Sequence, residues 1–478
     1  MRNNFDSLPP PAMGRILGIF TTCIHDGAAQ LNPTMKPAYA TERRGTEGLN
    51  VVAVVDGAAF HALQKMFSGF TTIDAVRQRM NALYGESMRF GDPGPSGLFF
   101  ATTDDPSFNL GMEVCQEVVA TFESDGYDAI GHPNGGAIEY TEHEPVNDDQ
   151  EEPGFTNCGS EIHDLDHWQP LCVPVENGSS VCEVQSMLSP NAGRWTTFVY
   201  DGQESLKLPG PPSYYGDHDE YIRQAREVAE FSANMTDVGK VLAEHWADGP
   251  DTTAPGGHWY RIAMEAAKNL GLGLYDTAKL LFLMGISQND AGVAAWESKR
   301  HFDFARPITM IQCGLGDETL ESWLGPYLGL GTLPASRWQP YQATTFVTPA
   351  FQGYVSGHST FSGAGAGAMN RFVGEEYVAP KCRRIEEGGS LFEGRVREGE
   401  PGYVEGMTDV PNNGPYSIGY APATDVVLCW ETWDEAAEES GISRLHGGIH
   451  IIADHIDGKA MGLKLADLVY EKAIQLWT

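Results

Sequence analysis

Three short segments in the second half of the chain carry residue types that could together hold an oxyanion. Lys299, Arg306 and Arg444 are cations in a chain with 31 basic and 65 acidic residues. Ser356 adds a hydroxyl group, and Gly357 adds a backbone N–H that no side chain shields. A Ser-Gly-His sequence that enters a helix places its N–H groups at the helix N-terminus, where anions are favoured. Because Arg donates to two oxygens and Lys acts as a point charge, these residues predict a compact guest with several negative oxygens.

Two histidines in the same segments could supply a bond to the guest and proton transfer. Of His358 and His450, one ring can bond the central atom of the oxyanion and the other can move protons. Asp454 follows His450 by four residues and could orient its ring, provided that the helix has begun there. Helix capping, or an ion pair elsewhere, explains Asp454 equally well. Each segment alone is weak, but all three in this order are hard to produce by chance.

The net charge of −34 limits the partners that the protein could have. So large a negative charge argues against nucleic acid and against an anionic membrane. The most apolar run, residues 280–286, is far too short to span a bilayer. The apolar stretch at residues 16–20 is short and ends in polar residues, so no signal peptide is predicted. The compartment stays open, since the chain could be cytoplasmic, or exported after a leader was removed.

Eight cysteines are scattered along the chain without a CxxC pair or a zinc spacing. Cys172 and Cys182 flank the turn-rich stretch VPVENGSSV, which makes a local disulfide plausible. Eight free thiols are the simpler expectation. The residues His163, Asp164, Asp166 and His167 have metal-ligand types, but acidic loops are common and no metal site is expected there.

Hydrophobic periodicity predicts an all-α protein with an irregular, acidic, loop-rich insertion. In the first part of the chain, helical patterns cover residues 15–29, 72–84 and 111–124. Residues 141 to about 215 are acidic and loop-like, with one or two short strands expected, for example at 195–200. We therefore expect a helical and loop-rich part at 1–215 and a helical bundle carrying the site at 216–478, packed as one compact unit.

The pattern becomes strongly helical after residue 216. Long helices are predicted over residues 217–246, over 258–268 and on through 272–286, over 290–301, over 360–372 and over 443–477. The stretch 360–372 is rich in Gly and Ala, which would let neighbouring helices approach closely.

The three segments resemble the signature of the vanadium-dependent haloperoxidases and of the related acid phosphatases in the PAP2 superfamily. The matching blocks are K-x6-RP, then SGH, then SR-x5-H-x3-D. One departure is Val355, where many members have Pro before SGH, and it affects no ligand. GRILGIFTTCIHDGAA, HWQPLCVP, TAPGGHW and the sequence around GISQNDAGVAAWESK also resemble bacterial haloperoxidases, so the resemblance covers roughly residues 15–455. It implies a mostly α-helical fold built on two four-helix bundles.

The resemblance also implies a role for each residue of the three segments. His450 would bond vanadium through a ring nitrogen, and His358 would be the acid–base histidine. The vanadate oxygens would be held by Lys299, Arg306, Ser356, Gly357 and Arg444. Vanadate would activate hydrogen peroxide, with Lys299 polarising the peroxide, and halide would be oxidised to hypohalous acid or an equivalent. That product would halogenate a small organic acceptor, while vanadium acts as a Lewis acid in its highest oxidation state.

Two aromatic residues bear on the choice of halide. Trp296 lies three residues before Lys299, and Phe351 lies seven before His358. Chloroperoxidase-type members have Trp and Phe at these places, and a dry aromatic pocket would strip water from a halide. We expect bromide to be oxidised and chloride as well, with iodide a further candidate, although both aromatics could be plain core residues. His446 is expected beside the site, where relatives often have an aromatic residue.

Two other functions compete with the haloperoxidase. A PAP2-type acid phosphatase would use the same donors for phosphate, with His450 as the phosphorylated nucleophile. A non-catalytic helical protein that binds an oxyanion would not need His358. The resemblance of the flanking segments and the Trp296–Phe351 pair favour the haloperoxidase. A homo-oligomer is compatible with the sequence, which does not select an assembly.

Overall fold

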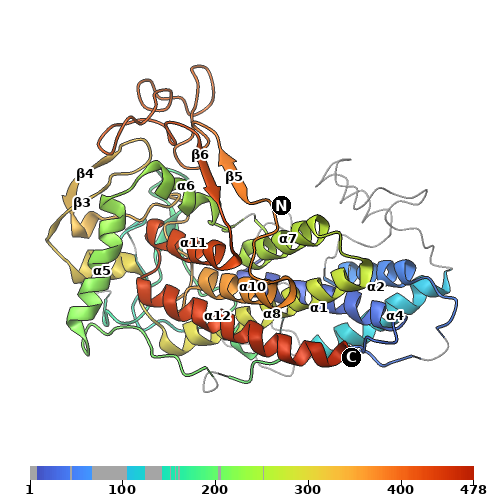
Figure 1. The fold of residues 1–478 in the computed structure, drawn as a ribbon. Helices are drawn as coiled ribbons and strands as arrows, with labels where there is room; N and C mark the ends of the chain where they lie inside the picture. The colour runs from blue at the N-terminus through green and yellow to red at the C-terminus, as the bar shows by residue number, and fades with distance from the viewer. Residues whose placement is uncertain are drawn as a thin grey trace.

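The predicted all-α class is confirmed by a computed structural model of the chain (Figure 1). It describes residues 8–43, 46–66, 105–123, 127, 143–150, 152–156, 158–159, 162–202, 206–250 and 252–478. The helices are α1 Pro10–Ala29, α2 Val51–Met66, α4 Pro106–Phe122, α5 His218–Ala233, α6 Asp237–His245, α7 Ala254–Asn269, α8 Leu274–Phe302, α9 Pro307–Gly314, α10 Gly357–Val373, α11 Trp433–His446 and α12 Ile452–Ala473. Short 3-10 helices cover Ala192–Arg194, Ala335–Arg337 and Ile474–Leu476.

Helix α8 is the centre of the fold. It has 29 residues and is buried along most of its length, as expected for a helix that is apolar on all sides. In Figure 1, α1, α8, α10 and α12 run side by side through the middle of the molecule. Helices α2 and α4 pack at one end, and α5 and a small hairpin lie at the other. The first half of the chain thus packs directly on the second through α1 and α8.

Small residues allow α10 and α12 to approach closely, as the Gly- and Ala-rich stretch predicts. A Cβ atom added at Gly363 would lie 2.4 Å from the carbonyl oxygen of Lys459. One added at Gly462 would lie 2.1 Å from the carbonyl oxygen of Thr360. Neither position has room for a side chain. This contact sets the start of α10 beside the start of α12, where two of the three segments lie.

Three two-stranded antiparallel sheets and four disulfides complete the described structure. The sheets pair β1 Cys172–Pro174 with β2 Cys182–Val184, β3 Thr319–Trp323 with β4 Leu330–Pro334, and β5 Cys382–Ile385 with β6 Val426–Cys429. The disulfide between Cys172 and Cys182 is confirmed. The expectation of free thiols is wrong, because the other six cysteines pair as Cys23–Cys115, Cys158–Cys313 and Cys382–Cys429.

The patterns at 15–29, 111–124 and 360–372 correspond to α1, α4 and α10, but other boundaries were predicted wrongly. Residues 217–246 form two helices, since Thr236 caps α6 by accepting a hydrogen bond from the Gly239 N–H. Residues 274–302 form one helix, where a break before 290 was expected. The predicted last helix divides at Gly448, whose φ of +70° ends α11. The pattern at 72–84 lies outside the described residues.

The one or two short strands expected in the acidic region are present as β1 and β2, but the strand expected at 195–200 is wrong. A 3-10 helix ends at Arg194, and the bent chain that follows donates three of its N–H groups to one carboxylate. The N–H groups of Phe198, Val199 and Tyr200 all bond Asp290 of α8, at 2.7 to 3.1 Å. The β-type residues are therefore present, but their N–H groups pair with a buried helix residue rather than with a neighbouring strand.

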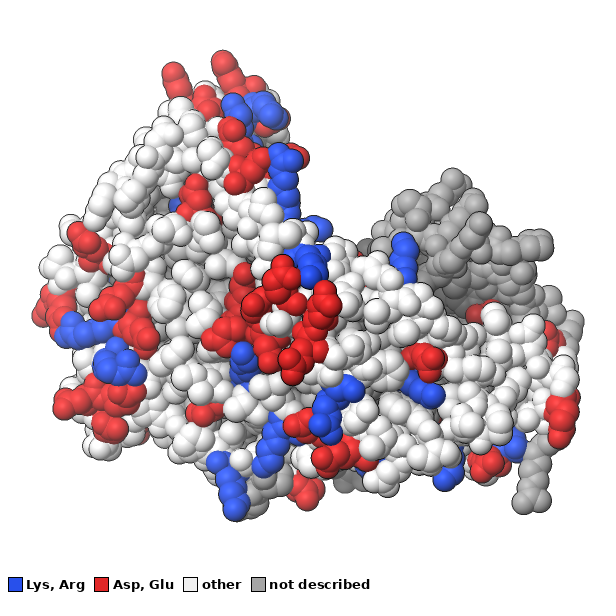
Figure 2. All heavy atoms as spheres, in the orientation of Figure 1, with Lys and Arg blue, Asp and Glu red and all other residues white. Residues whose placement is uncertain are grey.

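The surface is acidic, in keeping with the net charge. Asp and Glu side chains are spread across the face seen in Figure 2, with Lys and Arg interspersed among them. Some of them form exposed ion pairs, such as Arg226 with Glu318 at 2.6 Å. Within the described residues, no helix is both long and apolar enough to cross a membrane.

Candidate active site

His450 lies in the loop between α11 and α12, and its ring is fixed from both sides. Nδ1 lies 2.7 Å from Oδ2 of Asp454, and Nε2 lies 3.1 Å from Nη1 of Arg306. A guanidinium group only donates, so Nε2 carries the lone pair and Nδ1 carries the hydrogen. Burial, and then the cations Arg306 and Lys299, lower the pKa of His450 well below its usual value. The ring is therefore a neutral imidazole whose Nε2 lone pair accepts from Arg306.

Asp454 reaches this ring in a different way from the one expected. His450 precedes α12, so the two residues do not share a helical face. Asp454 stands in the first turn of the helix, where its Oδ2 also accepts the Ile451 N–H at 3.3 Å. Capping and ring orientation, which the sequence offered as alternatives, are thus carried out by one carboxylate oxygen. Burial raises the pKa of Asp454, against the effect of the nearby Lys299 and Arg306.

Two buried guanidinium groups have donors without a protein partner. Arg306 donates from Nε to the carbonyl of Phe351 at 2.8 Å and from Nη1 to that of Ile449 at 2.7 Å, but its Nη2 has no partner. Arg444 donates from Nη1 to the carbonyl of Trp246 at 2.7 Å, and its Nε has none. Burial lowers the pKa of Arg306 to about 9 and that of Arg444 to about 10. Such buried donors are costly unless a ligand satisfies them.

Lys299 is fully buried, and the protein satisfies all of its donors. Its Nζ lies 2.8 Å from the carbonyl oxygen of Gln352, 3.0 Å from that of Gly353 and 2.6 Å from that of Val355. Burial, and then the neighbouring Arg306, lower the pKa of Lys299 well below its usual value. The sequence places Lys299 among the oxyanion ligands, whereas the structure brings it into the cluster with its N–H groups aimed at backbone carbonyls.

The Ser-Gly-His sequence forms the start of α10, as predicted. Ser356 is the N-cap residue, and its Oγ accepts the Ser359 N–H at 3.3 Å. Gly357 is the first helical residue, and a Cβ there would lie 3.4 Å from the ring of Trp296. The first N–H groups of a helix have no partner within it. This helix end can therefore donate to an anion next to the aromatic ring.

His358 has the opposite tautomer from His450. Its Nε2 lies 3.1 Å from the carbonyl oxygen of Ala247, so Nε2 carries the hydrogen and Nδ1 has the lone pair. Burial, and then Arg444, lower its pKa well below the usual value, while Asp248 acts in the opposite direction. A neutral ring with a free Nδ1 can accept a proton.

The rings of Trp296 and Phe351 both lie next to the Lys299 ammonium group. Their ring centroids are 4.8 Å apart, and Nζ of Lys299 lies 5.1 Å from the Phe351 centroid and 5.8 Å from that of Trp296. His446 is placed differently. Its ring packs edge-on against Phe231 of α5 at 4.8 Å, and its buried Nδ1 has no partner. His446 also lies against α6, because a Cβ added at Gly239 would be 2.7 Å from its Nδ1.

Sequence reasoning missed Asp248, which belongs to the loop before α7. This carboxylate accepts from Nδ1 of His258 at 3.1 Å, and its charge acts on both His358 and Arg444. Asp248 has a positive φ of 42° and lies in no motif, so no signal in the sequence could have identified it.

The residues with metal-ligand types near position 165 bond mainly to partners elsewhere in the chain, although Nε2 of His167 also lies 3.9 Å from Oδ2 of Asp164. His163 pairs with Asp148 at 2.9 Å, and Asp166 accepts from the Ser213 hydroxyl at 2.6 Å. His167 bonds Asp303 at 3.0 Å. In the part of the chain that the structure describes, no group of three or more His, Cys, Asp or Glu residues is arranged to hold a metal ion.

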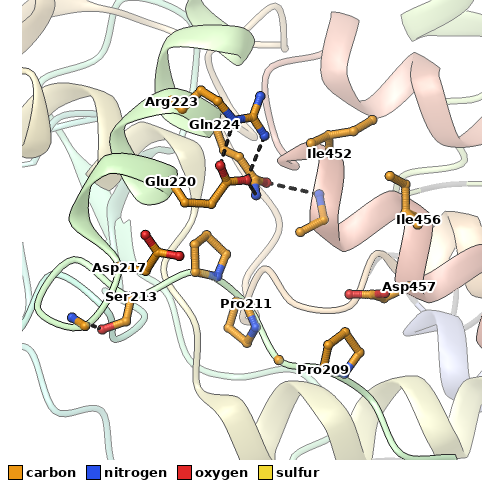
Figure 3. Close-up of a pocket in the computed structure, with 14 residues that line it drawn as sticks. Pro209, Pro211, Ser213, Asp217, Glu220, Arg223, Gln224, Ile452, Ile456 and Asp457 are labelled. Carbon is orange, nitrogen blue, oxygen red and sulfur yellow. Dashed lines mark hydrogen bonds and ion pairs between the residues drawn. The ribbon is translucent and has the colours of Figure 1, made fainter.

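A surface pocket of about 510 Å³ adjoins the site without containing it. Figure 3 shows Pro209 and Pro211 across from Ile452 and Ile456 of α12. None of the oxyanion-binding candidates lines it. Asp457 at its edge accepts a hydrogen bond from the hydroxyl of Tyr354 at 2.9 Å, so this pocket lies behind the segment that precedes Ser356.

Comparison with known proteins finds a family model that matches the C-terminal part of the chain, where these residues lie. Residues 279–478 match the model of the VCPO second helical-bundle domain, and this range includes every residue of the three segments. No curated protein matches the chain in sequence.

Solved structures resemble the whole chain at low sequence identity. A holo-type bacterial vanadium-dependent chloroperoxidase has a TM-score of 0.74 at 19% identity, covering 98% of this chain and 94% of that one. An apo-type bacterial vanadium-dependent chloroperoxidase has a TM-score of 0.74 at 18%, covering 100% and 97%. A bacterial vanadium-dependent iodoperoxidase has a TM-score of 0.65 at 18%, covering 98% and 92%. Residues 279–478 therefore match the VCPO second helical-bundle domain, and the chain as a whole has the fold of the bacterial vanadium-dependent haloperoxidases.

Proposed function

We propose that the chain is a vanadate-dependent haloperoxidase, which oxidises halide with hydrogen peroxide. The observation that carries the proposal is a set of buried polar atoms without partners. Arg306 Nη2 and Arg444 Nε are buried donors that no protein atom accepts from, and His450 Nε2 keeps a lone pair beside them. A small oxyanion with an electrophilic central atom satisfies both kinds of atom at once.

The donor set fits vanadate. His450 would bond the metal through Nε2, with Asp454 holding the ring in the required tautomer. Arg306, Arg444, the Ser356 hydroxyl and the Gly357 N–H would hold the oxygens, and Lys299 would add positive charge. Bound vanadate supplies a Lewis acid that activates peroxide towards halide.

The protein's own residues would provide positioning, proton transfer and a dry pocket. His358 can take a proton at Nδ1, because its Nε2 hydrogen is held by the Ala247 carbonyl and its lowered pKa keeps the ring neutral. Trp296 and Phe351 are buried next to Lys299 and would exclude water from a halide. This supports bromide as a substrate, with chloride or iodide as further candidates. Hypohalous acid, or an equivalent, would then halogenate a small organic acceptor.

The same geometry suits a phosphatase, which is the second candidate. The lone pair of His450 Nε2 in a cationic pocket is what phosphoryl transfer to histidine needs. The haloperoxidase is preferred because the family model covers the whole set of segments and because two aromatic rings adjoin the cations.

The decisive experiment measures both activities on one preparation. Peroxide-dependent bromination of a phenol dye is assayed with and without added orthovanadate, alongside hydrolysis of a phosphate ester. Bromination is expected only with orthovanadate. His450→Ala should abolish orthovanadate binding, while His358→Ala should slow turnover by about 10²- to 10⁴-fold and weaken binding less.

His218→Ala serves as the matched control, because His218 is exposed at the start of α5. It should leave bromination and binding unchanged. Bromination that ignores orthovanadate would contradict the proposal. Brisk ester hydrolysis without bromination would establish the phosphatase, and tight binding without either reaction would establish a non-catalytic oxyanion protein.

A further inference from the structure

The backbone from Phe351 to Val355, which we call the carbonyl segment, holds two cations of the site. The carbonyl of Phe351 accepts from Arg306 Nε at 2.8 Å. The carbonyls of Gln352, Gly353 and Val355 accept from Lys299 Nζ at 2.6 to 3.0 Å. The position of both side chains thus depends on a stretch of five residues outside any helix or strand.

The Gln352 side chain anchors this segment. It is fully buried, and its amide Nε2 donates to Oδ1 of Asp303 at 2.9 Å. One residue further on, the N–H of Gly353 donates to the carbonyl of Phe304 at 2.9 Å. Both contacts tie the carbonyl segment to the residues that directly follow α8.

Asp303 joins three parts of the chain at this point. Its own N–H donates to the carbonyl of Lys299, closing the last turn of α8 at 3.0 Å. Oδ1 also accepts from Nε2 of His143 at 2.8 Å, and Oδ2 accepts from Nδ1 of His167 at 3.0 Å. The residue has a positive φ of 47°, a strained conformation for Asp that its surroundings must maintain.

The geometry points to Asp303 and Gln352 as positioning residues for Lys299 and Arg306; this rests on the proposed function of the site. Asp303 bonds both to the end of α8, the helix that carries Lys299, and to the carbonyl segment, which accepts hydrogen bonds from the Lys299 ammonium group. Neither side chain contacts the candidate oxyanion-binding atoms directly. They act through the carbonyls, because cations in a dry site bind an oxyanion well only when they are held in place beforehand.

The contacts of His143 and His167 extend this arrangement to the acidic region before α5. Both rings end on the same carboxylate, and the N–H of Trp168 donates to the Asp303 carbonyl at 2.7 Å. The acidic, loop-rich region that the sequence predicts therefore helps to hold Asp303 in place.

The test uses Gln352→Leu, which removes the amide with little change in volume. Orthovanadate and inorganic phosphate are each titrated into the apoprotein by calorimetry. Affinity should fall about 10- to 100-fold, the usual effect of losing a group that orients a ligand. The conservative variant Asp303→Asn keeps an acceptor for the amide and should lose less affinity than Asp303→Ala. With bound vanadate, kcat should fall more than the KM for bromide rises.

Gln312→Leu is the matched control. Gln312 is as deeply buried, and its side chain makes two hydrogen bonds, to Thr156 N at 2.8 Å and to the Trp338 carbonyl at 2.7 Å. It should lower the melting temperature and leave oxyanion affinity within about twofold. If Gln352→Leu behaves in the same way, the two residues only stabilise the fold and the inference fails.

The outcomes separate this inference from the proposed function. If the wild type brominates with orthovanadate but Gln352→Leu binds as the wild type does, only the inference is overturned. If the wild type shows no bromination but Gln352→Leu weakens phosphate binding, the haloperoxidase is overturned and the positioning role stands.

Discussion

Two buried clusters of charge among the described residues differ in how their polar atoms are satisfied. One is the proposed oxyanion site, with Lys299, Arg306 and Arg444. The other, which we call the anchor cluster, consists of Lys240, Glu244 and Glu393. All six side chains are less than 10% exposed. Burial alone therefore does not distinguish a functional site from a structural one.

Every carboxylate oxygen of the anchor cluster has a partner. Lys240 forms an ion pair with Oε2 of Glu393, whose Oε1 accepts from the Trp323 indole at 3.0 Å. Glu244 accepts from the Tyr341 hydroxyl at 2.7 Å through Oε1 and from the Leu391 N–H through Oε2. These contacts join α6 to the long excursion between β5 and β6. The cluster is complete without a ligand.

The site has two cations whose donors remain free. Arg306 Nη2 and Arg444 Nε have no partner. The carboxylates that act on them accept from histidines, Asp248 from His258 and Asp454 from His450 through Oδ2, while Oδ1 of Asp454 has no partner. Removing such charges from water costs several kcal/mol, on the order of 5. The contrast teaches that incomplete pairing of fully buried cations, more than burial or charge alone, supports a ligand site.

The largest effect is expected in the anchor cluster. Lys240→Met leaves Glu393 buried without its cation, so the free energy of unfolding in urea should fall by about 3–5 kcal/mol. Lys240→Met combined with Glu393→Gln should recover most of the loss, since the amide oxygen can still accept from Trp323. Oxyanion affinity should not change in either protein. A loss below about 1 kcal/mol in the single variant would contradict the structural role.

A smaller effect on binding, with the opposite effect on stability, is expected at the site. Arg444→Met removes a desolvated charge with a free donor, so the apoprotein should be as stable as the wild type or more so. Orthovanadate affinity, measured by calorimetry, should fall by about 2–4 kcal/mol, or roughly 30- to 1,000-fold. The control Arg226→Met removes only an exposed ion pair with Glu318. If Arg444→Met lowers the free energy of unfolding as much as Lys240→Met does, the claim that only the anchor cluster stabilises the fold is contradicted.

The cluster that the structure brings together could be identified in the sequence because its residues occur in short local motifs. Lys299, Arg306, Ser356, Gly357 and His450 belong to three segments, and hydrophobic periodicity predicts the helices around them. The positions of α1 and α10 follow from the same periodicity.

The helix break, the long-range contacts and most of the disulfides could not be predicted, because they depend on single residues or on partners far apart in the sequence. The break before α6 results from one Thr cap, while the apolar spacing continues across it. The charge of Asp248 acts on His358, which is 110 residues later in the sequence. Asp303 pairs with His143, which is 160 residues earlier. Three of the disulfides join cysteines 47 to 155 residues apart, and eight cysteines allow about 105 pairings.

The smallest effect concerns His245, which lies between the two clusters at the end of α6. Its ring stacks on Trp430 at 5.7 Å and faces His258, Asp248, Arg383 and Arg261. Burial, and then His258, lower its pKa to about 4. In the unfolded chain the ring takes up a proton near pH 6.5, whereas the folded protein does not. The stability that comes from the neutral ring is therefore complete above pH 6.5 and is lost as the pH falls towards 4.

His245→Phe keeps the aromatic stack and removes the titration. The wild type should lose up to about 3 kcal/mol of unfolding free energy through this group between pH 6.5 and 4. The variant should show a smaller loss over the same interval, measured by urea titration at each pH. At pH 7, His245→Phe should change the free energy of unfolding far less than Lys240→Met does. The effect of His245→Phe should also be the same with and without orthovanadate. Equal pH dependence in the two proteins would mean that folding does not lower the pKa of His245, and it would contradict the burial of a neutral ring.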